Sequence, residues 1–136
     1  IIYMYECHPH PLWMPVDPAS SARMRLVHHR VLRDWYALAL EIEGAGARKV
    51  DKPRQQLKES IVAANDLFKH SDFLLSDELS LVDCTLAPLF WRLPVYGITL
   101  GKPGSAVQAY IQRLISRRSF KTSLTRAERE MVLNLA

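Results

Sequence analysis

The segment from Ser80 to Tyr96 constrains the fold of this chain more than any other. Apolar residues occupy nearly every side of a helix drawn through it: Leu81, Val82, Cys84, Leu86, Ala87, Leu89, Phe90, Trp91 and Leu93. A helix that is apolar all round has no face to offer to water, so it must be covered on all sides. We therefore predict a helix over 80–96 at the centre of the molecule, with the other elements packed around it.

The rest of the chain shows amphipathic helical patterns that supply this cover. Asp17 followed by Pro18 is a strong helix start, because Asp caps free backbone amides and Pro loses no hydrogen bond at the first helical position. An apolar stripe then runs from Met24 to Ile42, and "GAGA" at 44–47 ends it. Similar patterns predict further helices over about 51–70, over about 107–115 and after the capping-box spacing of Thr125 and Glu128. No segment reads as a strand, so the sequence predicts an all-α bundle of about five helices.

Length and composition limit the class of protein. A chain of 136 residues corresponds to about one domain, and its two cysteines, Cys7 and Cys84, are too far apart to indicate a disulfide scaffold. No run reaches the roughly 18 to 20 apolar residues of a membrane-spanning helix, and the N-terminus lacks the features of a signal peptide. We expect a cytoplasmic protein with reduced thiols.

The first residues indicate that the chain is a fragment of a longer protein. The opening "IIYMYEC" has no initiator methionine and begins inside an apolar segment that offers nothing to cap its first amides. The prolines of "HPHPLWMPVDP" then stop the helical pattern. We predict that residues 1–6 are the last turns of a helix that begins before Ile1.

Ser80 and Asp83 have two possible roles. Their spacing is that of a capping box, in which the Ser80 hydroxyl accepts from the Asp83 amide and the Asp83 carboxylate accepts from the Ser80 amide. A serine and an aspartate could also belong to a catalytic set, but no histidine has a clear claim to the third position. We expect the structural role, and we expect no catalytic residue in this chain.

The histidines and cysteines raise the question of a metal site. The one cluster in the sequence consists of Cys7, His8, His10, His28 and His29. Adjacent ligands, a histidine between prolines and two histidines about 100° apart on a helix match no familiar zinc pattern. We therefore expect no metal and no cofactor, with one of His28 and His29 at the edge of the core and the other in solvent.

The C-terminal third carries several basic residues: Arg113, Arg117, Arg118, Lys121, Arg126 and Arg129. Arg113 and Arg117 share one helix face, which could follow phosphate groups. Glu128 and Glu130 interrupt the positive field, however, and no aromatic residues alternate with the arginines. The sequence favours a solvated helix surface, and direct nucleic-acid binding is not expected.

The segment "HPHPLWMP" at 8–15 is the strongest candidate for a binding function. Pro9 and Pro11 fix the backbone on both sides of His10, so the imidazole is held on a stiff segment at little cost in entropy. Rigid display of this kind suits the docking of a partner, and a plain connector between domains is the alternative; the residues alone leave both open. For Trp13 and Met14 we favour packing back onto the helices.

Three stretches carry a resemblance to a known family: "RVLRDWY" (30–36), "FLLSDELSLVDCTLAPLFWRLPVYGI" (73–98) and "SLTRAEREM" (123–131). Together they resemble the stringent starvation protein A family, bacterial RNA polymerase-associated proteins with a glutathione S-transferase-like fold. The resemblance implies the end of a thioredoxin-like domain at 1–7, an interdomain segment at 8–17 and the all-helical C-terminal domain of that fold at 18–136.

The same resemblance implies a function for the Pro-His-Pro motif. Pro9, His10 and Pro11 would form an exposed surface that contacts RNA polymerase holoenzyme and its sigma factor. The protein would be a homodimer or a heterodimer with a paralogue, and it would regulate transcription without catalysis. Relatives continue the motif with Pro-Leu-Met-Pro, whereas this chain has Leu12-Trp13-Met14-Pro15.

The alternative function is that of a working glutathione S-transferase. In that class, the thiol-activating residue and most glutathione contacts come from the thioredoxin-like half. Because residues 1–136 would contain only the end of that half, they do not decide between a regulator and an enzyme.

Overall fold

The computed structural model describes residues 2–8, 12–44 and 50–133. Within these ranges it contains eight α-helices and no strand: α1 (Ile2–Cys7), α2 (Pro18–Arg30), α3 (Ala37–Gly44), α4 (Asp51–Ala63), α5 (Leu81–Trp91), α6 (Ser105–Ser116), α7 (Arg118–Ser123) and α8 (Arg126–Leu133). Phe73 and Ser76 form an isolated bridge. The all-α prediction is confirmed, with more and shorter helices than the five expected. None of the helices in the described ranges is long and apolar enough to span a membrane.

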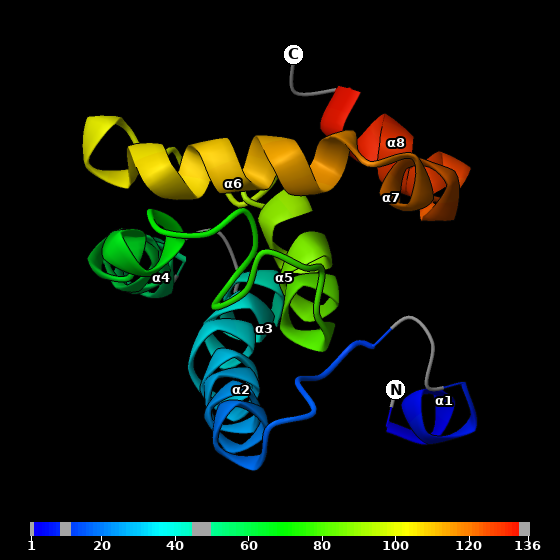
Figure 1. Ribbon diagram of the computed structural model, residues 1–136. Helices are drawn as coiled ribbons and strands as arrows, with labels where there is room; N and C mark the ends of the chain where they lie inside the picture. Colours follow the sequence, from blue (N-terminus) through cyan, green and yellow to red (C-terminus); the bar gives the residue numbers. More distant parts are fainter. Residues whose placement is uncertain (1, 9–11, 45–49, 134–136) are drawn as a thin grey trace.

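The helix α5 lies at the centre of the bundle, as its apolar pattern predicts. It packs against α2 on one side and α6 on the other (Figure 1). The helix ends at Trp91, whereas the sequence pattern predicted helix as far as Tyr96. Pro94 explains the difference, because it has no amide hydrogen to donate and disfavours the helical conformation in Leu93 before it. The chain therefore leaves the helix in a series of turns over 92–97.

The helices α2 and α3 form one continuous rod, joined by a π-helical segment at Val31–Tyr36. The sequence predicted a regular helix here, and it carries no local signal for the wider turn. The π segment lets two neighbouring aromatic residues reach different partners. The Trp35 indole N–H donates to Ser60 Oγ at 2.8 Å, and the Tyr36 hydroxyl donates to the Thr85 carbonyl at 2.7 Å. These bonds tie the rod to α4 and to α5, which offsets the poorer geometry of a π turn.

A side chain from one element caps the start of another. The 3₁₀ turn Asn65–Phe68 follows α4, where the sequence pattern predicted α-helix to about His70. Asn65 is buried, and its Oδ1 accepts from the amides of Ala106 and Val107 at 3.0 and 3.2 Å. The start of α6 is thereby satisfied, although its own N-cap residue is a glycine without a side chain.

The C-terminal end of the chain contains one helix that the sequence did not reveal. Arg117 adopts φ −60° and ψ 137°, which ends α6 and lets the short α7 begin in a new direction. The capping box predicted for the last helix is confirmed. The Thr125 amide and hydroxyl both donate to Glu128 Oε2, at 2.9 and 2.8 Å, and the Glu128 amide donates back to Thr125 Oγ1 at 3.3 Å.

Aromatic side chains from four elements meet in the core. Phe90 on α5 lies 5.9 Å from the ring centroid of Trp35, 6.3 Å from that of Phe68 and 6.1 Å from that of Tyr110. Phe68 and Tyr110 are themselves 4.7 Å apart. The rings are tilted or edge-to-face, the arrangements that aromatic quadrupoles favour. This cluster joins the π segment, the 3₁₀ turn and α6 to the central helix.

Candidate partner-binding surface

The Pro-His-Pro motif at 9–11 lies outside the described residues, and its flanks define the surface around it. His8, which follows α1, is exposed, and the chain is described again from Leu12. Leu12 is 43% exposed and Val16 is 77% exposed, whereas Met14 between them is only 7% exposed. Two apolar side chains beside the motif thus face solvent while the residue between them is anchored in the core.

The segment that follows the motif is fastened to the helical body. The Leu81 amide, at the start of α5, donates to the Trp13 carbonyl at 2.9 Å. Asp17 caps α2, with its Oδ2 accepting from the Ser20 amide at 2.7 Å, and these hydrogen bonds to Ser20 lower the pKa of the Asp17 carboxyl. Trp13 is half-buried and Met14 is buried, as predicted. The backbone next to the motif therefore has a fixed position.

A shallow groove of about 130 Å³ lies along this segment. Its walls come from two stretches of chain: Leu12, Trp13, Met14, Pro15 and Val16 on one side, and Ser76, Glu78, Leu79 and Ser80 on the other, with Met24 of α2. No pattern in the sequence indicates that the 76–79 loop lies beside this segment. The two stretches are at least 60 residues apart in the chain and meet only through tertiary contacts, so no local pattern could have shown this.

Asp83 is fully buried and accepts hydrogen bonds through both carboxyl oxygens. Oδ2 accepts from the Ser80 amide at 2.7 Å and from the Ser80 hydroxyl at 2.6 Å, within a complete capping box. Oδ1 accepts from the Leu74 amide at 2.9 Å and from the Tyr110 hydroxyl at 2.6 Å. Burial, together with the Asp83 carboxyl, raises the pKa of Tyr110. Ser80 is 3% exposed, so neither it nor Asp83 is open to a substrate.

His28 packs against the central helix α5 and forms no hydrogen bond with Ser80 or Asp83. Its Nε2 lies 3.0 Å from Thr85 Oγ1, which itself donates to the Leu81 carbonyl. The hydroxyl proton is thus used, so Nε2 is the donor to Thr85. Burial, and to a lesser degree His29, lower the pKa of His28. His29 is exposed, and no three His, Cys, Asp or Glu side chains gather into a metal-binding group in the described part of the chain.

Cys84, next to Asp83 on α5, is partly buried and poorly suited to act as a nucleophile. Burial first, and then the Asp83 carboxyl, raise the pKa of its thiol from an ordinary 9.0 to about 11, against a smaller opposing effect of Arg117. The thiolate, which is the reactive form, is therefore scarce near neutral pH.

We expect iodoacetamide to alkylate the exposed Cys7 well before Cys84 in the folded protein near neutral pH. Labelling of Cys84 should increase as the pH approaches about 11, where the folded protein also loses the stability that the neutral thiol contributes. Mass spectrometry of proteolytic peptides after timed labelling measures both rates. Labelling in urea is the control, since there the two thiols should react alike; equal rates in the folded protein would contradict the prediction.

Comparison with known proteins agrees with this architecture. The model of the family "Glutathione S-transferase, C-terminal domain" matches residues 13–118. The structure of glutathione transferase Omega 3C from Trametes versicolor superposes with a TM-score of 0.78 at 20% sequence identity, covering 98% of this chain and 61% of that chain. At this identity, the likeness concerns the fold alone.

Curated relatives confirm the resemblance that the sequence motifs carry. Stringent starvation protein A homologs from Haemophilus ducreyi and Pasteurella multocida are each 37% identical to this chain, over 124 and 123 residues and 90% of its length. The homolog from Coxiella burnetii is 32% identical over 130 residues. The chain spans about three fifths of the length of these relatives, 58% to 62%. By its fold and by the family model that matches most of its length, the chain belongs to the glutathione S-transferase C-terminal domain family.

Proposed function

We propose that this protein regulates transcription in the stringent starvation response by direct contact with RNA polymerase holoenzyme. The observation that carries the proposal is the similarity to stringent starvation protein A homologs, at 32% to 37% identity over at least 90% of the chain. The contact surface consists of Pro9, His10 and Pro11 together with the exposed Leu12 and Val16. The chain then divides into the end of a thioredoxin-like domain at 1–7, an interdomain segment at 8–17 and the helical domain at 18–136, in a protein that acts as a dimer.

The described part of this surface has properties that a docking site needs. Its backbone is held by the Leu81–Trp13 hydrogen bond and by the buried Met14, so little conformational entropy is lost on binding. Leu12 and Val16 offer apolar contact area, and Ser76 and Glu78 add polar groups at the edge of the groove. Apolar anchors beside a few polar groups are typical of protein–protein interfaces.

The candidate chemical groups of the helical domain have structural roles. Ser80 and Asp83 are sealed into a cap, and the Cys84 thiol is held in its neutral form. His28 is committed to Thr85. These four residues therefore serve the architecture of the domain.

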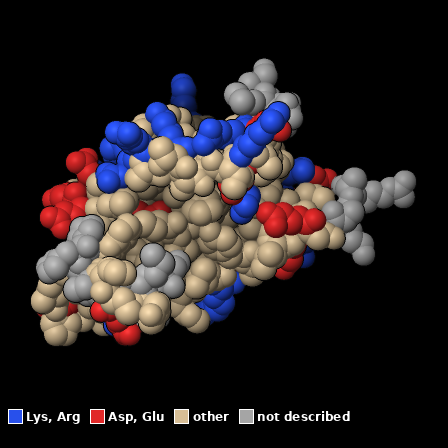
Figure 2. All heavy atoms as spheres, turned by 90° about the vertical axis from the view of Figure 1, so that its right-hand side faces the viewer, with Lys and Arg blue, Asp and Glu red and all other residues tan. Residues whose placement is uncertain are grey.

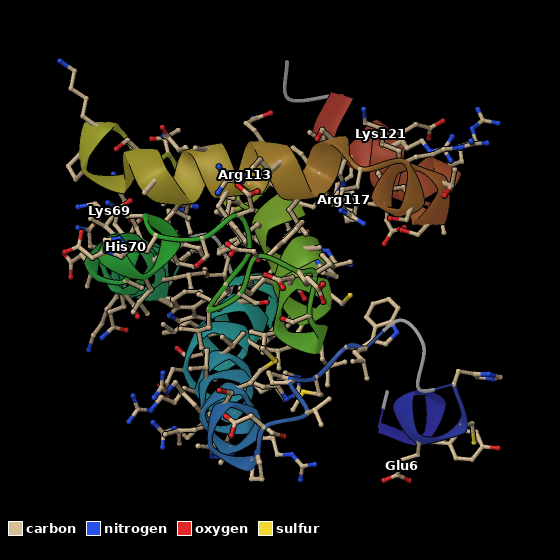
Figure 3. The ribbon with its side chains drawn as sticks, in the orientation of Figure 1. Glu6, Lys69, His70, Arg113, Arg117 and Lys121 are labelled. Carbon is tan, nitrogen blue, oxygen red and sulfur yellow. The ribbon has the colours of Figure 1, made fainter. Side chains whose placement is uncertain are left out.

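We expect His10→Ala to reduce the RNA polymerase retained by the natural protein by roughly tenfold, the effect of losing a contact worth about 1.4 kcal/mol. Affinity capture from starved cells, with quantification of polymerase subunits, measures this retention. His70→Ala is the matched control, because His70 is exposed and lies on the far side of the molecule from α1 (Figure 3).

Two results would count against the proposed function. Polymerase retention by His10→Ala equal to that of the unaltered protein would remove the Pro-His-Pro surface from the interaction. Robust conjugation of glutathione to an electrophilic substrate by the natural protein would favour the transferase alternative.

A further inference from the structure

The net positive charge of this chain is concentrated at one end of the bundle. Residues 1–104 contain twelve Lys and Arg against twelve Asp and Glu, so they carry no net charge. Residues 105–136 contain six basic residues against two acidic ones, which accounts for the whole net charge of +4. These residues form α6, α7 and α8, which lie together across the top of the molecule (Figure 1).

The two acidic residues of this region are occupied by internal contacts. Glu128 accepts from the Thr125 amide and hydroxyl at the start of α8, and Arg92 approaches it at 3.9 Å. Glu130 pairs with Arg126 at 2.6 Å. From sequence alone, these glutamates were expected to interrupt the positive field. In the folded chain, Glu130 pairs with Arg126 and Glu128 completes the cap of α8. Neither glutamate forms an ion pair with Arg117, Arg118, Lys121 or Arg129.

Four exposed cations lie between the end of α6 and α8, and we call them together the basic face: Arg117, Arg118, Lys121 and Arg129. None of them forms an ion pair within residues 2–8, 12–44 and 50–133. The Arg117 guanidinium lies over the Phe73 ring, 5.5 Å from its centroid, and this cation–π contact helps to hold it in place. Figure 2 shows basic side chains gathered along the upper edge of the molecule, and Figure 3 places Arg117 and Lys121 beyond the C-terminal end of α6.

We propose that the basic face binds the phosphate backbone of duplex DNA without reading its sequence. Duplex DNA carries one negative charge per about 1.7 Å of its axis, so even a short segment laid along α7 and α8 brings several phosphates to this part of the protein. Three of the four are arginines, whose planar guanidinium groups match phosphate oxygens in pairs. The DNA contact is separate from the Pro-His-Pro surface and does not depend on the polymerase contact.

An acidic protein segment is the competing occupant, and the geometry favours DNA over it. A hollow of about 490 Å³, with Trp91, Leu124 and Val132 among its lining residues, could accept an apolar anchor of such a segment. Only Lys121 and Arg129 border this hollow. An apolar anchor seated there would contact neither Arg117 nor Arg118, whereas a phosphate backbone is charged along its whole length and extends beyond the hollow.

The test measures the affinity of the natural protein for a fluorescently labelled duplex of about 20 base pairs. Fluorescence anisotropy gives this affinity at salt concentrations between 50 and 200 mM. A logarithmic plot of affinity against salt should have a slope of about −3 to −4 for the contacts of the basic face. Arg118→Gln with Lys121→Gln should reduce the magnitude of this slope by about two and weaken binding severalfold. Neither side chain has a hydrogen bond or an ion pair in the described structure, so the fold should be unaffected.

The matched control is Arg25→Gln with Lys52→Gln. It also removes one arginine and one lysine, but from exposed positions on α2 and α4. It should leave the slope and the affinity within about twofold of the unaltered protein. Equal weakening by both double variants, or a slope near zero, would overturn the proposal. Poly-glutamate that binds as tightly as the duplex would overturn it in favour of an acidic protein partner. Binding of the duplex by His10→Ala at unaltered affinity is expected and separates this contact from the polymerase contact.

Discussion

Replacing Asp83 with alanine is expected to lower the free energy of unfolding by about 4 kcal/mol, because several buried donors lose their acceptor at once. The donors are the amides of Leu74 and Ser80 and the hydroxyls of Ser80 and Tyr110. Asp83 is 0% exposed, so water cannot replace the lost carboxyl without a rearrangement of the core. Chemical denaturation followed by circular dichroism measures the change.

Two further variants locate the origin of this effect. Asp83→Asn keeps the size of the side chain but replaces one acceptor oxygen with an amide donor, so we expect about half to two thirds of the loss. Tyr110→Phe removes a single donor and should cost about 1 kcal/mol. Asp77→Asn, at an exposed position in the same loop, is the control and should change stability by less than about 0.5 kcal/mol. If Asp83→Ala were as mild as this control, the carboxyl would not be the organising group of the α5 start.

Replacing Phe90 with alanine is expected to lower the free energy of unfolding by about 3 to 5 kcal/mol, since the change combines lost burial with a cavity at the centre of the aromatic cluster. Phe90 is 2% exposed and faces Trp35, Phe68 and Tyr110, each within 6.3 Å. Those three side chains belong to the π segment, the 3₁₀ turn and α6, which all pack against α5 through Phe90. Their simultaneous loss of contact should also reduce the cooperativity of unfolding, visible as a lower denaturant dependence.

A second variant at position 90 separates the contribution of side-chain volume from that of the aromatic ring. Phe90→Leu retains much of the volume, so we expect it to cost less than about 1.5 to 2 kcal/mol. Leu67→Ala removes a side chain that is 52% exposed on the neighbouring 3₁₀ turn and should be close to neutral. A Phe90→Ala protein with stability equal to that of Leu67→Ala would show that the core rearranges freely around α5.

Local patterns were sufficient where the deciding interactions are local. The central position of α5 followed from its apolar composition, since no placement other than the interior can cover it. The starts of α2 and α8 followed from Asp17 and from the Thr125–Glu128 box, whose hydrogen bonds span three residues. The capping box at Ser80 and Asp83 is present in the structure, with the same short span.

Local patterns were wrong where distant side chains decide the backbone. The π segment of the α2–α3 rod depends on hydrogen bonds from Trp35 to Ser60 and from Tyr36 to Thr85. No local pattern in the sequence predicts these bonds, because the partners lie 25 and 49 residues away. The early end of α4 depends on Asn65, which caps α6 from 41 residues away. Two of the four donors to Asp83 likewise come from outside its capping box.

The sequence by itself determined the helical class of this protein, the burial of α5 and the breaks that proline imposes on the helical pattern. These depend on composition, on caps and on the restricted backbone of proline, all properties of a few consecutive residues. The tertiary structure alone decided which stretches line the groove beside Leu12 and which cations remain without an acidic partner. Both depend on distances between residues far apart in the chain, and such distances exist only once the helices have packed.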